Sequence, residues 1–324
     1  MATTKKKVVR AASAPQAEAA AASDWKPTAE AKSKATTKRI IAAVCWVVAI
    51  GLEAFAIFWV LKQFGDDGIP IFGMSDGTGA LILLIILLVV MGVLAVLGSM
   101  QWKAANHLDP ASRQNAVRFF VQNQLGAIIT VIAFLPLIIL IFLNKDMDGK
   151  QKGIAGAVGI VVLLVAGFLS VDRNPVSTED MGYDDQVVAA LAGQTTAADV
   201  KVYWVKGGSV YHVCEAVPDV NRESSSGKCA LTEGQEPPDE CGIYEGTVAQ
   251  ARLDGKSRLT KKWESEASQY CGISQDRIDA AKAIQEGGAA PAGDTATEPA
   301  AEQSSAESAP AESSAAEPAT EETP

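Results

Sequence analysis

One apolar segment, Gly126–Leu143, constrains this chain more than any other feature of the sequence. It contains no charged residue, and Thr130 and Pro136 are its main departures from an apolar run. At about 1.5 Å of rise per residue, a helix of this length spans roughly 27 Å, close to the hydrocarbon thickness of a bilayer. The run ends at Asn144-Lys145-Asp146, where the chain returns to water. The segment is therefore predicted to be a membrane-spanning helix.

Three further apolar runs of similar length precede or follow this one. The predicted transmembrane domain covers residues 39–171, with spans at about 40–61, 81–100, 125–143 and 153–171. The first run is too long for the apolar region of a cleaved signal peptide, so we expect it to be retained as a helix. The predicted fold class is a membrane all-α four-helix bundle followed by a small soluble α+β module, with disordered termini.

The two ends of the chain have compositions unlike the apolar part. Residues 1–38 are basic and rich in Ala, Ser and Thr, and residues 287–324 form an acidic Ala/Glu/Ser/Pro tail. The formal net charge of the chain is −10, and eight of its acidic residues lie in this tail. Segments with so little apolar surface cannot offset the entropy of ordering, so both are predicted to be disordered. A basic arm beside a membrane is more often in contact with anionic lipid than with nucleic acid. We therefore do not expect nucleic acid as a partner.

Lys and Arg near the span ends predict the orientation, because cytoplasmic loops carry an excess of them. The amino terminus, the loop between the second and third spans, and the carboxyl terminus share one side of the membrane. That side carries nine such residues and the other side four. The nine are Lys26, Lys32, Lys34, Lys38, Arg39, Lys103, Arg113, Arg118 and Arg173, and the four are Lys62, Lys145, Lys150 and Lys152. Both termini are therefore predicted to be cytoplasmic.

Residues 172–286 are predicted to form the soluble module. Segments 200–205 and 209–214 alternate between apolar and polar residues and are joined through Lys206-Gly207-Gly208, which indicates a β-hairpin. Thr247 and Gln250 form a capping-box pattern at the start of a short helix. A last helix is expected from Ser274 to Gln285. Between the second and third spans, Asp109-Pro110 indicates either an interfacial helix or an early start of the third helix.

Glu53 is the one charged side chain inside a predicted span. A carboxyl group in hydrocarbon is costly and by default suggests function. No Lys, Arg or His in any span can pair with it, so we expect it to be protonated or hydrogen-bonded to a neighbouring helix near Thr130. Pro136 should bend the third span and free a backbone carbonyl near Ile132. Glu53, Thr130 and Pro136 are the candidate intramembrane polar residues.

Four of the five cysteines lie in the predicted module, where they suggest disulfides, a metal site or plain thiols. These residues are Cys214, Cys229, Cys241 and Cys271, with His212 nearby. No CxxC pair is present, which weakens a zinc interpretation. Disulfides require an oxidising compartment, which conflicts with a cytoplasmic module. No firm metal ligand is assigned, no cofactor is expected, and zinc is kept as the alternative.

Enzymatic interpretations find little support in the sequence. The chain has two histidines, and it lacks GxSxG, Walker and Rossmann patterns. His212 lies in a predicted strand. A histidine there is more often a structural residue that is hydrogen-bonded to its neighbours than a catalytic base. No catalytic residue is assigned, and the chain is predicted not to be an enzyme.

Two segments resemble a family of uncharacterised multi-span membrane proteins of Gram-positive bacteria, chiefly actinobacteria. They are WKAANHLDPASRQNAVRFFVQNQLGAIITVIAFLPLIILIFLNKDMDGKQKGIAG, residues Trp102–Gly156, and VDRNPVSTED, residues Val171–Asp180. WVVAIGLEAFAIF, which contains Glu53, fits the same pattern. The resemblance covers roughly residues 40–260. It implies four helices in a bacterial plasma membrane and supplies no activity.

The soluble end is similar to the small hairpin-plus-helix modules that end these proteins. The segments that carry this similarity are VYWVKGGSVYHVC and YEGTVAQARLDGKSRL. Such modules often have a Cys shortly after the YH pair and a CxxC after the helix, which suggests zinc. Here Cys214 follows His212 by two residues, but Thr260-Lys261-Lys262-Trp263 replaces the CxxC.

The leading functional hypothesis is a non-enzymatic plasma-membrane protein that anchors a small interaction module, as a scaffold or accessory subunit of an envelope complex. Its expected partners are the lipid bilayer and either another protein or further copies of the chain. The first alternative is a small transporter or ion-conducting protein that uses Glu53. The second is metal or redox sensing through the module cysteines.

Overall fold

The computed structural model describes residues 8–10, 25–65, 68–74, 77–221 and 242–287. Four helical segments within this part are long and apolar enough to cross a membrane. They are α1 (Ala29–Phe58) with the 3₁₀ helix η1 (Val60–Phe64), α2 (Thr78–Leu108), the pair α3 (Ala116–Ile132) and α4 (Leu135–Leu143), and α5 (Gly149–Ser170). The prediction of four long apolar helices is confirmed, and by their length and composition these helices are compatible with a multi-pass membrane protein.

The third span is two helices because the chain breaks at Ala133 and Phe134. Pro136 lies in the first turn of α4 and has no backbone N–H, so the helix cannot continue its hydrogen bonds across this point. Both residues of the break are completely buried against the other helices. The sequence predicted a bend at Pro136, and the structure instead has a break between two helices at this point.

The first helix begins earlier than the expected boundary at residue 39. Thr28 caps α1 by accepting a hydrogen bond from the Ala31 amide at 3.1 Å. Ala31 and Ala35 then pack against Ala105 and Leu108 near the end of α2. These tertiary contacts make residues 29–38 helical although they contain little apolar surface. The remainder of the basic arm outside 8–10 and 25–28, and the acidic tail beyond 287, lie outside the described residues.

A polar network closes the connection between α2 and α3. Arg39 of α1 pairs with Asp109 at 2.6 Å, and the Trp102 indole and the Asn106 amide both donate to the Gln122 carbonyl. Asn115 caps α3, so residues 109–115 are not helical. Among the described residues 109–115 there is therefore no separate interfacial helix between α2 and α3, and the third helix starts earlier than predicted. It starts at Ala116, so Asp109 and Pro110 do not form its cap and first turn.

The module predicted for residues 172–286 is a small α/β unit. Strand β4 (Ile243–Thr247) lies between β2 (Lys201–Val205), which is antiparallel to it, and β1 (Val8–Arg10), which is parallel. Strand β3 (Val210–Tyr211) pairs in parallel with β5 (Arg258–Leu259). Tyr203 and His212 exchange two backbone hydrogen bonds of 2.8 Å, which close the expected hairpin. The buried Lys256 donates to the Lys206 carbonyl and holds its turn.

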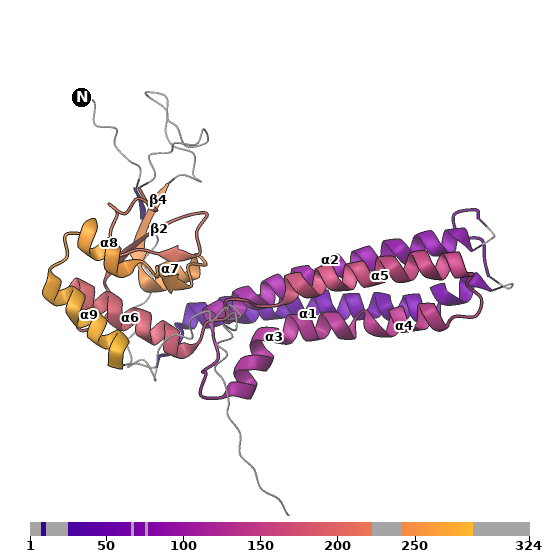
Figure 1. Ribbon diagram of the computed structural model, residues 1–324, viewed down its shortest axis with the longest axis horizontal. Coiled ribbons are helices and arrows are strands. Elements are labelled where there is room, and N and C mark those ends of the chain that lie inside the picture. The colour runs from indigo at the N-terminus through magenta and orange to yellow at the C-terminus, as the bar shows by residue number, and fades with distance from the viewer. Residues whose placement is uncertain (1–7, 11–24, 66–67, 75–76, 222–241, 288–324) are drawn as a thin grey trace, which may run out of the picture. The chain divides into compact units, whose positions relative to one another are not determined.

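Four helices complete the core of the module. They are α6 (Thr178–Ala192), α7 (Val248–Leu253), α8 (Trp263–Gln269) and α9 (Gln275–Gly287), with α6 and α9 side by side (Figure 1). Thr247 and Gln250 make the expected capping box at α7. Trp204 and Tyr211 from the strands are fully buried among apolar side chains of these helices.

Close helix packing in the bundle generates a stability prediction at Gly98 of α2. A Cβ atom at Gly98 would lie 2.5 Å from Nε1 and 2.7 Å from Cδ1 of Trp46, whose ring is 6% exposed and packs against Trp102. Gly98→Ala should therefore destabilise the bundle by about 1–3 kcal/mol, as overpacking does. The measurement is the thermal unfolding temperature of the purified protein in detergent.

Gly167→Ala in α5 is the matched control, because no atom lies within 4 Å of the Cβ it adds. Alanine favours a helix over glycine, so this variant should unfold at the wild-type temperature or slightly above it. Equal unfolding temperatures for the two variants would contradict the packing described for Trp46.

Candidate functional site

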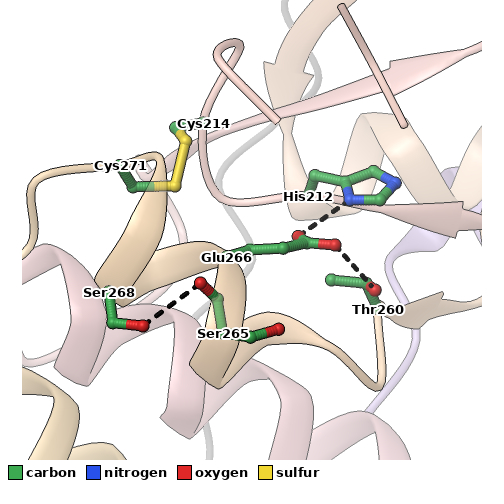
Figure 2. Close-up of a disulfide and its surroundings, with 7 residues drawn as sticks. All are labelled: His212, Cys214, Thr260, Ser265, Glu266, Ser268 and Cys271. Carbon is green, nitrogen blue, oxygen red and sulfur yellow. Dashed lines mark hydrogen bonds and ion pairs between the residues drawn. A yellow bond between two sulfur atoms is a disulfide. The ribbon is translucent and has the colours of Figure 1, made fainter. Parts of the chain in front are cut away.

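A disulfide joins the segment after β3 to the end of α8. The Cys214 and Cys271 sulfurs are 2.00 Å apart, and the two Cα atoms are separated by 5.6 Å (Figure 2). The pair packs against a small apolar cluster of Val217, Val220 and Ile243. A cross-link between residues 57 apart stabilises a fold by roughly 4 kcal/mol in the chain-entropy model. The bond therefore contributes substantially to a module with a modest core.

The structure does not describe the other two candidate cysteines. Cys229 and Cys241 lie outside the described residues, and Cys45 is a free thiol in α1. Within the described ranges, no group of three or more His, Cys, Asp or Glu residues is placed to hold a metal ion. Of the three interpretations of the cysteines, the structure gives a disulfide for Cys214 and Cys271.

His212 belongs to a buried hydrogen-bond chain. Its Nδ1 lies 2.9 Å from Oε2 of Glu266, and the Thr260 hydroxyl donates to Oε1 of the same carboxylate at 3.2 Å (Figure 2). All three residues are at most 5% exposed. Pairing of this kind satisfies polar groups that would otherwise be costly to bury. The His212 side chain is a structural member of the core, and a substrate has no access to it in this conformation.

The donor set around His212 does not fit the zinc site that the resemblance implies. Thr260 supplies a hydroxyl at the start of the segment where the CxxC would lie, and Glu266 uses both carboxylate oxygens for hydrogen bonds. The Cys214 sulfur is bonded to Cys271 and is not a thiolate. Zinc prefers thiolate and imidazole ligands. Among the described residues, His212 therefore has a hydrogen-bonded carboxylate beside it and not a thiolate.

A second buried cluster, which the sequence analysis missed, connects α6 with α7. Arg252 pairs with Asp185 at 2.8 Å and donates to the Met181 carbonyl at 3.0 Å. The Trp25 indole, just before α1, also donates to Asp185 at 3.0 Å, and its ring lies 5.3 Å from the guanidinium carbon. Asp184 accepts the Leu259 amide at 2.8 Å. The only feature of the sequence that could have indicated this cluster is the adjacent pair Asp184 and Asp185. Two adjacent carboxylates in a helix usually lie on a solvent-exposed face.

Burial controls the protonation of this cluster. It raises the pKa of Asp184 to about 7, against the opposing influence of Arg252 and of the Leu259 amide. Burial also disfavours the charged form of Arg252, but Asp185 and the neighbouring groups raise the pKa of its guanidinium overall. Arg252 stays charged, and Asp184 is the group of the cluster that changes state near neutral pH.

The intramembrane candidates do not form one site. The Thr130 hydroxyl donates to the Gly126 carbonyl at 2.8 Å and lies 3.1 Å from the Ser170 hydroxyl. Glu53 is 5% exposed and lies within hydrogen-bonding reach of the Leu137 amide. Glu53 therefore meets the helix that follows Pro136, and the expected neighbour Thr130 has other partners.

Comparison with models of known protein families, with curated protein sequences and with solved structures finds no match to this chain.

The buried carboxyl of Asp184 predicts a pH-dependent stability of the module. Its pKa is about 7 when folded and 3.8 ordinarily, so between these values the folded state holds a proton that the unfolded state has lost. Stability should therefore fall as pH rises from about 4 to 7, by about 1.4 kcal/mol per pH unit at the steepest, and this contribution should level off above pH 7. Hydrogen exchange of the β2 and β4 amides measures it.

Asp184→Asn should remove most of that slope, because the side-chain amide oxygen can still accept from Leu259 and does not ionise. At pH 8 the variant should protect the module amides at least as well as the wild type. Asp276→Asn, at an exposed carboxyl in α9, is the control and should retain the slope. A D184N variant with the wild-type pH dependence would contradict the assignment.

Proposed function

We propose that this chain is a non-enzymatic integral protein of a bacterial plasma membrane that presents its disulfide-linked module to a protein of the cell envelope. The chain would then act as a scaffold or accessory subunit. The observation that carries this proposal is the Cys214–Cys271 bond in a module held directly to the membrane bundle. Such a unit suits binding better than chemistry, because its buried His212 is not accessible to a substrate.

Polar contacts attach the module to the bundle. Arg113, before α3, pairs with Asp180 of α6 at 2.9 Å, and the adjacent Ser112 hydroxyl donates to Glu179. Trp25 contacts Asp185 on the same helix. A module attached at several points keeps a defined position at the membrane, which lowers the entropy cost of binding a partner there. This supports a presenting role.

The disulfide supports a location of the module outside the cytoplasm, because such bonds persist in oxidising compartments and are rare in the cytosol. With four spans, the amino terminus would share that side. This placement reverses the orientation that the Lys and Arg count predicts. We give the covalent bond more weight, since a module that relies on it for stability must fold where it can form.

Labelling of cysteines in intact cells tests the placement. In a chain with Cys45, Cys229 and Cys241 replaced by Ser, a membrane-impermeant maleimide should not react until a membrane-impermeant reductant is added. It should then add two labels per chain, at Cys214 and Cys271, measured by mass spectrometry. The same chain with these two residues also replaced gives the background.

Two results would contradict the proposed placement. Labels that appear only after the membrane is opened would put the module in the cytoplasm, as the charge count predicts. Labels that appear without reductant would show that the two sulfurs are thiols in the cell.

Cross-linking in intact cells tests the presenting role. An impermeant amine-reactive cross-linker followed by purification in mild detergent should recover one envelope protein with the full chain. Cys214→Ser/Cys271→Ser should recover at least a few-fold less of it, because the module loses its cross-link while the bundle remains. Recovery of the chain alone, or only of further copies of itself, would overturn the proposal.

A further inference from the structure

The third span contains a break at the depth where the membrane is most apolar. Phe134 is nine residues from either end of the predicted span 125–143, and both it and Ala133 are fully buried. Because Pro136 lacks an N–H, the Ile132 carbonyl cannot accept the hydrogen bond that would continue the helix. The first N–H groups of α4 likewise have no hydrogen-bond partner within that helix. The break therefore leaves backbone polar groups where lipid supplies no partner.

Glu53 of α1 lies at this break. The helices α1 and α4 pack against each other, and the Glu53 carboxyl is within hydrogen-bonding reach of the Leu137 amide in the first turn of α4. Its second oxygen, Oε1, is buried and has no hydrogen-bond partner among the described residues. The side chain is 5% exposed. One oxygen thus meets the amino-terminal end of a helix, which favours a negative charge, and the other is available to carry a proton.

No other charged side chain in the predicted spans would hold Glu53 in one protonation state. The four predicted spans, 40–61, 81–100, 125–143 and 153–171, include no other Asp, Glu, Lys, Arg or His. A metal cation such as Ca²⁺ requires six or more oxygen ligands, and a single carboxylate does not supply them. A proton requires one oxygen. The cation that this site can bind with its own side chains is therefore a proton.

We propose that Glu53 is a reversible proton-binding site in the middle of the membrane, held by the break between α3 and α4. In the reaction the carboxylate takes up one proton at an oxygen and forms a neutral carboxylic acid, and the reverse step releases it. The helix end stabilises the carboxylate, and the apolar surroundings stabilise the acid. Discontinuous helices near the membrane midplane form substrate and ion sites in many transporters.

Infrared difference spectroscopy of the full chain in lipid vesicles tests the proposal. Between acidic and alkaline pH, the wild type should lose a carboxylic-acid C=O band and gain carboxylate bands. The other 37 Asp and Glu carboxyl groups titrate in both proteins, so the contribution of Glu53 is the pair of bands that remains when the Glu53→Gln difference spectrum is subtracted from that of the wild type. The variant keeps the size of the side chain and an oxygen that can accept from Leu137, and its thermal unfolding temperature checks that it folds. Identical wild-type and E53Q difference spectra would overturn the proposal, since Glu53 would then keep one state.

A second measurement identifies the residue chemically. An apolar carbodiimide enters the membrane and adds to a protonated carboxyl group, with the acid O–H added across one C=N bond and no leaving group. Mass spectrometry should find one adduct per chain, on Glu53, with a yield that falls by about tenfold per pH unit above the midpoint of the infrared titration. An adduct yield independent of pH, or equal in E53Q, would contradict a proton site at this residue.

Discussion

Lipid offers no hydrogen-bond partner, and this constraint governs the membrane half of the chain. Four continuous or nearly continuous helices satisfy their own backbone groups, and their outer faces carry large exposed apolar side chains such as Val161, Leu164 and Phe168. Inside the bundle, the Thr130 hydroxyl lies 3.1 Å from the Ser170 hydroxyl, within hydrogen-bonding distance. The break at Ala133 and Phe134 is the exception, and a carboxyl from another helix lies against it.

Where the bundle meets water, charged and polar residues replace lipid-facing ones. Arg39 with Asp109 and Arg113 with Asp180 are partly exposed pairs, each worth at most about 1 kcal/mol alone. Their effect is positional, because each connects segments that are distant in sequence. Arg113 with Asp180, together with Trp25 on Asp185, holds the module to the bundle by contacts that a simple linker would not make.

The module combines a small apolar core with covalent and polar contacts that lie inside it. A soluble unit of this size buries limited apolar surface, so a disulfide adds stability that the core alone does not supply. The His212–Glu266–Thr260 chain and the Arg252 cluster fix which strands and helices meet.

The sequence by itself determined the four long apolar helices, a distortion of the third near Pro136, and the hairpin and the Thr247 cap of the module. These features depend on hydrophobicity and backbone preferences over a few neighbouring residues, which can be read along the chain. Only the tertiary structure decided that Cys214 bonds to Cys271, that Glu53 meets Leu137 and not Thr130, and that Arg252 pairs with Asp185. Residues 29–38 became helical for a similar reason, since Ala31 and Ala35 find their partners at the end of α2. Each of these outcomes depends on contact between residues far apart in the chain, and no local pattern records which distant residue will be the partner.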